Sequence, residues 1–147
     1  MALLANNIGE AEMLARIIGA HDGSAAGDSL MLRLFKVDIT PAEGDSLLEY
    51  VESDGTGYVA IAITGDSTTA DAWTYATGAG DTVSATYIQQ TFTYTAGTGD
   101  TLYGYYVTSK NEAGDTVCMW AEAFTDGPYT IPAGGGTVKV TPKIQLD

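Results

Sequence analysis

The chain has little that could carry a positive charge or a covalent crosslink: one cysteine, one histidine and six Lys or Arg residues in 147. A single cysteine excludes an internal disulfide, so the sequence favours a reducing compartment of synthesis over a disulfide-stapled secreted fold. Against 19 acidic residues the six cations leave a formal net charge of −13, and they are scattered along the chain. Because such a surface repels phosphate backbones and anionic membranes, we expect neither nucleic acid nor a membrane as partner.

The residue types that usually carry catalysis are sparse. His21, the only histidine, lies in a small polar segment, whereas a Ser-His-Asp triad needs an imidazole held between a nucleophile and a carboxylate. Cys118 lies within a strand pattern, with no helix N-terminus or basic neighbour to activate it, so we interpret it as a small hydrophobic residue. We therefore predict that the protein is not an enzyme.

A glycoside hydrolase would need two carboxylates facing each other across a cleft. The glutamates that could supply them are Glu49, Glu52, Glu112 and Glu122. No motif supports this alternative, and we expect structural ion pairs instead. Strand alternation places Glu122 on one face with Cys118, Trp120 and Phe124. If that face is buried, Glu122 needs a partner such as an arginine.

The dipeptide Gly-Asp recurs at positions 27, 44, 65, 80, 99 and 114. Glycine supplies a positive φ and aspartate bonds its own backbone, so the pair predicts turns. Calcium needs 6–8 oxygens converging on one point, and the EF-hand spacing is absent. We expect turns rather than a cation site, and no cofactor.

The N-terminal region predicts one short helix, from Asn7 to Gly19. Asn7 and Glu10 suit a capping box, and Gly19 suits the end of a helix. An apolar stripe runs along it at Ile8, Ala11, Leu14, Ile17 and Ile18. The first residues lack the basic start of a signal peptide, and no apolar run approaches the ~18 residues of a membrane span.

The rest of the chain predicts short strands joined by turns, at 29–39, 58–64, 73–76, 83–95, 102–109, 117–124 and 137–146. Pro142 lies inside the last of them, which favours an edge position or a bulge there. Gly104 suggests a bulge or a close backbone approach. Asp45–Val51 fits either a short helical turn or a strand. The expected fold is a single all-β domain, an antiparallel jelly-roll-like sandwich at 28–147 preceded by a helix and linker at 1–27.

The aromatic residues concentrate in 87–124, where Tyr103 and Tyr105 share one strand face and Trp120 and Phe124 another. We expect these rings to divide between core packing and a contact surface. The predicted protein interface consists of Ile8, Leu14, Ile17, Ile18, Trp73, Tyr103, Tyr105 and Trp120. An alternative is a carbohydrate-binding module that stacks sugars on Trp73 and Trp120.

Several segments taken in order carry a family resemblance: the helix followed by SLMLRLFKVDITP, then GYVAIAIT, TFTYT with LYGYYVTS, and MWAEAFTDGPYTIPAGGGTVKVTPKIQL. Together they resemble small β-rich structural proteins of tailed bacteriophages, including capsid decoration (cement) proteins. The resemblance implies a homotrimer on the outer capsid surface of the virion that is made in the host cytoplasm and bridges subunits of the major capsid protein. A tail or tail-fibre component is the alternative within the same family.

Overall fold

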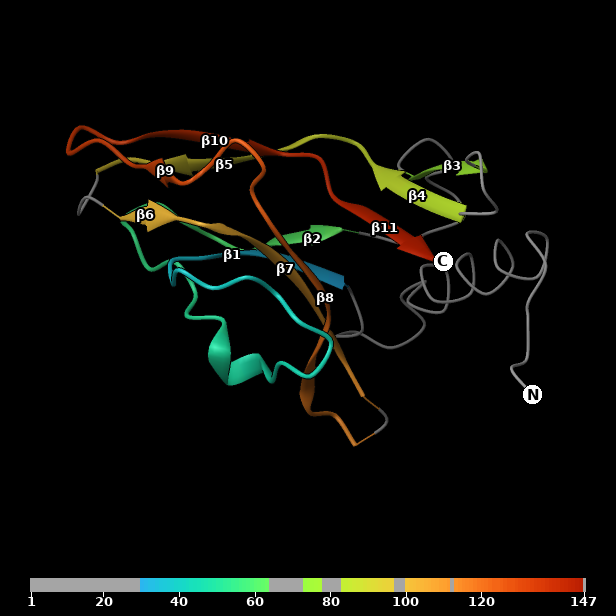
Figure 1. The fold of residues 1–147 in the computed structure, drawn as a ribbon. Coiled ribbons are helices and arrows are strands. Elements are labelled where there is room, and N and C mark those ends of the chain that lie inside the picture. The colour runs from blue at the N-terminus through green and yellow to red at the C-terminus, as the bar shows by residue number, and fades with distance from the viewer. Residues whose placement is uncertain (1–29, 64–72, 78–82, 97–99, 112, 147) are drawn as a thin grey trace, which may run out of the picture. The chain divides into compact units, whose positions relative to one another are not determined.

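The computed structural model describes residues 30–63, 73–77, 83–96, 100–111 and 113–146 (Figure 1). This part of the chain is mostly β-strand and its sheets are antiparallel. The other regular element in these ranges is a 3₁₀ turn, η1 at Leu47–Glu49, which settles the open choice for Asp45–Val51. The predicted helix at Asn7–Gly19 lies outside the described residues.

The backbone forms two compact units. One contains a three-stranded sheet of order β11-β4-β3, built from β3 (Trp73–Thr77), β4 (Val83–Tyr87) and β11 (Lys143–Leu146). The other contains η1, β1 and β5 to β10. The expectation of a single domain stays a prediction.

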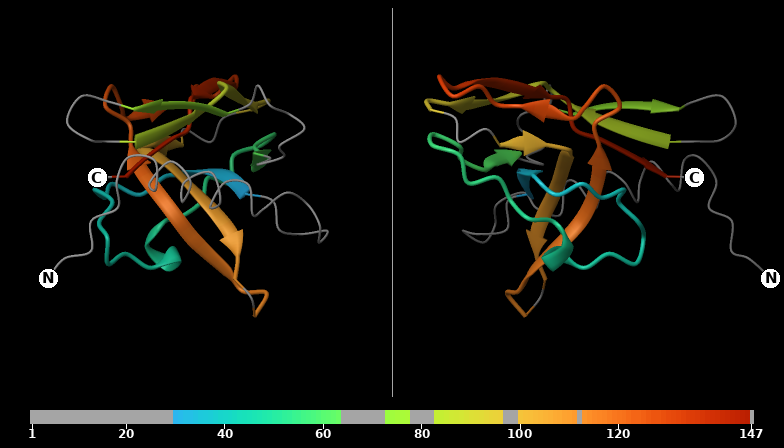
Figure 2. Two further views of the ribbon diagram at one scale, coloured as in Figure 1. Left: turned by 90° about the vertical axis from the view of Figure 1, so that its right-hand side faces the viewer. Right: turned by 60° about the vertical axis from the view of Figure 1, so that its left-hand side comes forward.

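The larger sheet has the strand order β2-β1-β7-β8. Its strands are β2 (Ile61–Ile63), β1 (Leu30–Phe35), β7 (Gly104–Lys110) and β8 (Thr116–Ala123). Strands β7 and β8 form a long hairpin, drawn in orange in Figures 1 and 2, with β8 at the edge of the sheet. Two-stranded sheets pair β5 (Gln90–Tyr94) with β10 (Gly136–Val140) and β6 (Thr101–Leu102) with β9 (Tyr129–Thr130).

Strand β1 is apolar apart from Arg33, and four of its six residues are buried. Leu30, Leu32 and Leu34 are fully buried, and so is Phe35 at the end of the strand. Phe35 forms a core cluster with Tyr50 and Tyr106, against which Tyr103, Leu47, Cys118 and Ala121 also pack. The rings of Tyr50 and Tyr106 stack with centroids 5.4 Å apart. The turn η1 therefore lies beside the β7–β8 hairpin, as Figure 2 shows.

In the paired strands β5 and β10, buried and exposed residues alternate along each strand. Phe92 and Val138 lie opposite each other in the register, and both are buried. Thr93 and Thr137 are the neighbouring pair, and both are exposed. A sheet that alternates in this way buries one face and exposes the other to solvent.

Two long predicted strands are each divided in the structure. The strand expected at 137–146 breaks at Pro142, between β10 and β11, because proline cannot donate to a ladder. The strand expected at 83–95 breaks at residues 88–89, between β4 and β5. Across the breaks the backbone amide of Tyr87 still donates to the carbonyl of Pro142, at 2.8 Å. The chain passes between the two units at these breaks.

Gly104 confirms the predicted close backbone approach. A Cβ at this position would lie 2.2 Å from the carbonyl oxygen of Glu122 and 2.4 Å from the Phe35 ring. The predicted bulge is not at Gly104. The register of β7 and β8 shifts between Val107 and Thr108, so the bulge lies there. Only glycine fits where β7 crosses Phe35.

Candidate functional site

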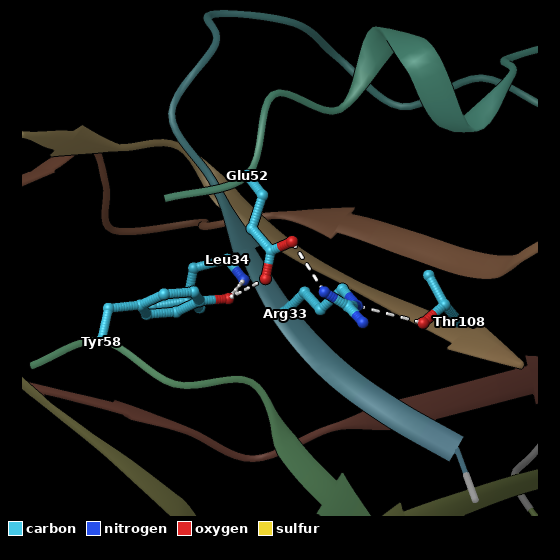
Figure 3. Close-up of polar contacts among 5 residues, drawn as sticks. All are labelled: Arg33, Leu34, Glu52, Tyr58 and Thr108. Atoms are coloured by element: carbon cyan, nitrogen blue, oxygen red, sulfur yellow. Dashed lines mark hydrogen bonds and ion pairs between the residues drawn. The ribbon is translucent and has the colours of Figure 1, made fainter. Parts of the chain in front are cut away.

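A polar network around Glu52 joins three segments of the larger unit (Figure 3). One carboxylate oxygen of Glu52 accepts from the Arg33 guanidinium at 2.7 Å, and the other accepts from the Tyr58 hydroxyl at 2.9 Å. The same Tyr58 hydroxyl accepts from the backbone amide of Leu34 at 3.0 Å, and Arg33 also donates to Thr108 at 3.2 Å. The network thus ties the segment after η1 to both β1 and β7.

Burial and the charge of Glu52 keep the tyrosine hydroxyls at this network protonated. Burial raises the pKa of Tyr58 well above its ordinary value, and the nearby charge of Glu52 raises it further. Burial raises the pKa of Tyr106 for the same reason, again assisted by Glu52. Because both hydroxyls keep their protons at neutral pH and both Glu52 oxygens are engaged, the network acts as a structural clamp rather than as an acid–base pair.

An open groove runs along β8 and is called here the β8 groove. It has a volume of about 350 Å³ and is lined by Pro41, Ala42, Glu43, Asp45, Tyr50, Cys118, Met119, Trp120 and Ala121. Asp45 accepts hydrogen bonds from the Tyr50 hydroxyl at 2.9 Å and from the backbone amide of Ala42 at 2.8 Å. Burial, with the Asp45 hydrogen bond as a second cause, raises the pKa of Tyr50, so this hydroxyl remains a donor.

A β-bulge shapes one wall of this groove. Thr108 faces Cys118 and Val107 faces Trp120, which leaves Met119 as the extra residue of β8. Cys118 therefore packs with Ala121 against the Phe35–Tyr50–Tyr106 cluster. The prediction that Cys118 shares a face with Glu122 and Trp120 is wrong, because a single extra residue reverses the alternation on one side of it.

A second open groove, of about 580 Å³, lies between the segment at 128–132 and β10. Tyr129 contributes an aromatic ring to this groove, and Lys139 is the one charged residue among those that line it. Tyr129 is 40% exposed and packs edge-on against Phe124. The cavity holds no acid–base pair among its lining residues.

The residues of the predicted interface have different environments. Ile8, Leu14, Ile17 and Ile18 lie outside the described residues. Trp73 and Tyr105 are buried, which argues against a contact surface at these two side chains. Tyr103 and Trp120 are half-buried, and Trp120 lines the β8 groove. Tyr103 lies in the break between β6 and β7 and packs on the cluster around Phe35.

Three of the four glutamates considered for hydrolysis, Glu49, Glu52 and Glu122, have structural partners. Glu122 accepts from the Tyr105 hydroxyl at 2.5 Å, so its partner is a tyrosine and not the arginine the sequence suggested. Glu49 accepts from the backbone amide of Ser46 at 2.5 Å, completing a capping box on η1. Glu112 and His21 lie outside the described residues. Trp73, one of the two rings proposed for sugar stacking, is buried.

Sequence reasoning missed the Glu52 network and the role of Met119. A signal for the first was present, since Arg33 lies on a strand that is otherwise apolar and a half-buried guanidinium needs a carboxylate. The sequence offered no comparable signal for Met119, because a bulge depends on how two strands pair.

Within the described ranges, no three His, Cys, Asp or Glu side chains gather as a metal site would require. The same residues include no helix long and apolar enough to cross a membrane. No family model, no curated protein and no solved structure matches the chain.

Proposed function

We propose that this chain is a virion structural protein of a tailed bacteriophage, a capsid decoration protein that binds the outer capsid surface as a homotrimer. Its partner is the major capsid protein, and its task is to bridge neighbouring subunits and stabilise the shell. In this proposal the antiparallel sheets pack as a jelly-roll-like sandwich, preceded by a short N-terminal helix. Many repeated weak contacts then give avidity without a deep pocket.

The observation that carries the proposal is that the segments bearing the phage resemblance form antiparallel strands. TFTYT contains most of β5, GYYVTS lies in β7, MWAEA in β8 and GTVKV forms β10. The clamp at Glu52 suits a rigid module, because it ties β1 and β7 to the segment between η1 and β2. A net charge of −13 favours solubility and attraction to a basic surface.

The test combines light scattering with co-sedimentation. Purified protein is expected to run as a trimer and to sediment with assembled capsids of the proposed phage but not with free DNA. A monomer without affinity for capsids would overturn the proposal. Immunogold labelling of whole virions separates the alternative, because a tail or tail-fibre component would be labelled on the tail and not on the head.

A further inference from the structure

The β8 groove combines an exposed apolar wall with carboxylates and has no cation among its lining residues. Its charged lining residues are Glu43 and Asp45. Its volume of about 350 Å³ lies at the lower end of the range for ligand sites, about 300–1,000 Å³. We propose that this groove docks a lysine- or arginine-bearing segment of a partner protein.

The bulge supplies the apolar wall. Met119, the extra residue of β8, lies between Cys118 and Trp120, and all three residues contribute to the lining of the groove. Met119 is 37% exposed, and its flexible thioether adapts to the aliphatic stem of a lysine or arginine.

The carboxylates complete the site. Asp45 is oriented in advance by its hydrogen bonds from Tyr50 and Ala42, so little ordering is needed when a cation arrives. Glu43 is exposed and makes no hydrogen bond or ion pair within the described part of the chain. The groove therefore offers an incoming basic group one carboxylate held by hydrogen bonds, Asp45, and one exposed carboxylate, Glu43.

Charge decides the occupant. A second copy of this chain also carries −13, so this acidic groove attracts it less than it attracts a basic protein. Two cations of the larger unit are already paired, Arg33 with Glu52 and Lys36 with Asp54. The groove therefore fits a basic partner protein better than it fits a second copy of this chain. The inference rests on the proposed function for one point, that this partner is a capsid subunit.

The test follows the methyl group of Met119 by NMR in the full chain labelled at methionine. The probe is the peptide acetyl-Lys-Leu-Lys-Leu-Lys-amide, compared with acetyl-Glu-Leu-Glu-Leu-Glu-amide. The Met119 signal is expected to shift and saturate with the lysine peptide only, and the binding to weaken as salt screens the charges. Glu43→Gln is expected to weaken it about twofold to fivefold. Asp126→Asn removes an exposed carboxylate outside the groove and is expected to leave the binding unchanged.

Three results would overturn the inference: an unmoved Met119 signal, equal shifts with both peptides, or a Met119 shift that follows the concentration of the protein itself. A Met119 shift in a chain that does not bind capsids would support the groove and reject the proposed function. Capsid binding that Glu43→Gln leaves intact would reject the groove and leave the proposed function standing.

Discussion

Removal of one hydroxyl group, by Tyr58→Phe, is expected to destabilise the larger unit because that hydroxyl serves two partners. It donates to Glu52 at 2.9 Å and accepts from the Leu34 amide at 3.0 Å. Leu34 is fully buried, so without Tyr58 its amide loses this partner in the core. The ring remains in phenylalanine and can still stack on Phe92, 5.6 Å away, and on Tyr94, 5.9 Å away.

The magnitude follows from the two lost hydrogen bonds. An orphaned buried amide costs about 1–3 kcal/mol, and a hydrogen bond to a charged group contributes about 1.5–3 kcal/mol. The second figure is reduced because the Glu52 side chain is 33% exposed and water replaces part of the interaction. We therefore expect the free energy of unfolding to fall by about 2–3 kcal/mol.

Urea unfolding measures this loss, with the m-value expected to stay unchanged. The matched control is Tyr129→Phe, which removes the same hydroxyl from a residue that is 40% exposed and is expected to change stability by less than about 0.5 kcal/mol. A double-mutant cycle with Glu52→Gln isolates the Tyr58–Glu52 term, expected to lie between about 0.5 and 2 kcal/mol. Equal stabilities of the Tyr58→Phe and Tyr129→Phe variants would refute the reasoning.

Three further outcomes are expected. Gly104→Ala destabilises by at least about 1–3 kcal/mol in urea unfolding through the close contacts at its Cβ, whereas Gly134→Ala, with open space around it, stays within about 0.5 kcal/mol; equal effects would contradict this. Because the pKa values of Tyr50 and Tyr58 are raised, the stability that they contribute is fully present below about pH 10 and is lost as pH rises through their folded values. As pH is raised, the tyrosinate absorbance of the folded chain should therefore increase at a higher pH than that of the urea-unfolded chain. If the two absorbance curves coincide, the tyrosines are not buried as described. Burial also raises the pKa of Cys118, so its reaction with a disulfide reagent at pH 8 should be slower than that of the unfolded chain; equal rates would exclude a protected thiol.

Local alternation predicted the strands well, because it depends on neighbouring residues alone. β10 matches its expected pattern, with Val138 and Val140 buried between exposed Thr137 and Lys139. From the sequence, Pro142 indicated only an edge position or a bulge within one longer strand. That the chain continues there into a different sheet depends on pairing between distant segments, which periodicity does not contain.

The candidate site was less predictable for the same reason. The Glu52 network joins residues as far apart in sequence as Arg33 and Thr108. Arg33 on an otherwise apolar strand was a signal that the prediction did not use, and the 19 acidic residues of the sequence would have offered many possible partners. The wrong face assigned to Cys118 is more instructive, since one extra residue in β8 reverses every inference made from alternation across it.

The same bulge bears on how a partner can bind. Strand β8 lies at the edge of its sheet, where a regular strand would invite another chain to add by backbone hydrogen bonds. A bulge disrupts such addition and turns side chains outward. Recognition at β8 should therefore depend on Met119 and on the facing carboxylates, and not on backbone pairing. Substitution in the groove should therefore alter affinity without altering the sheet.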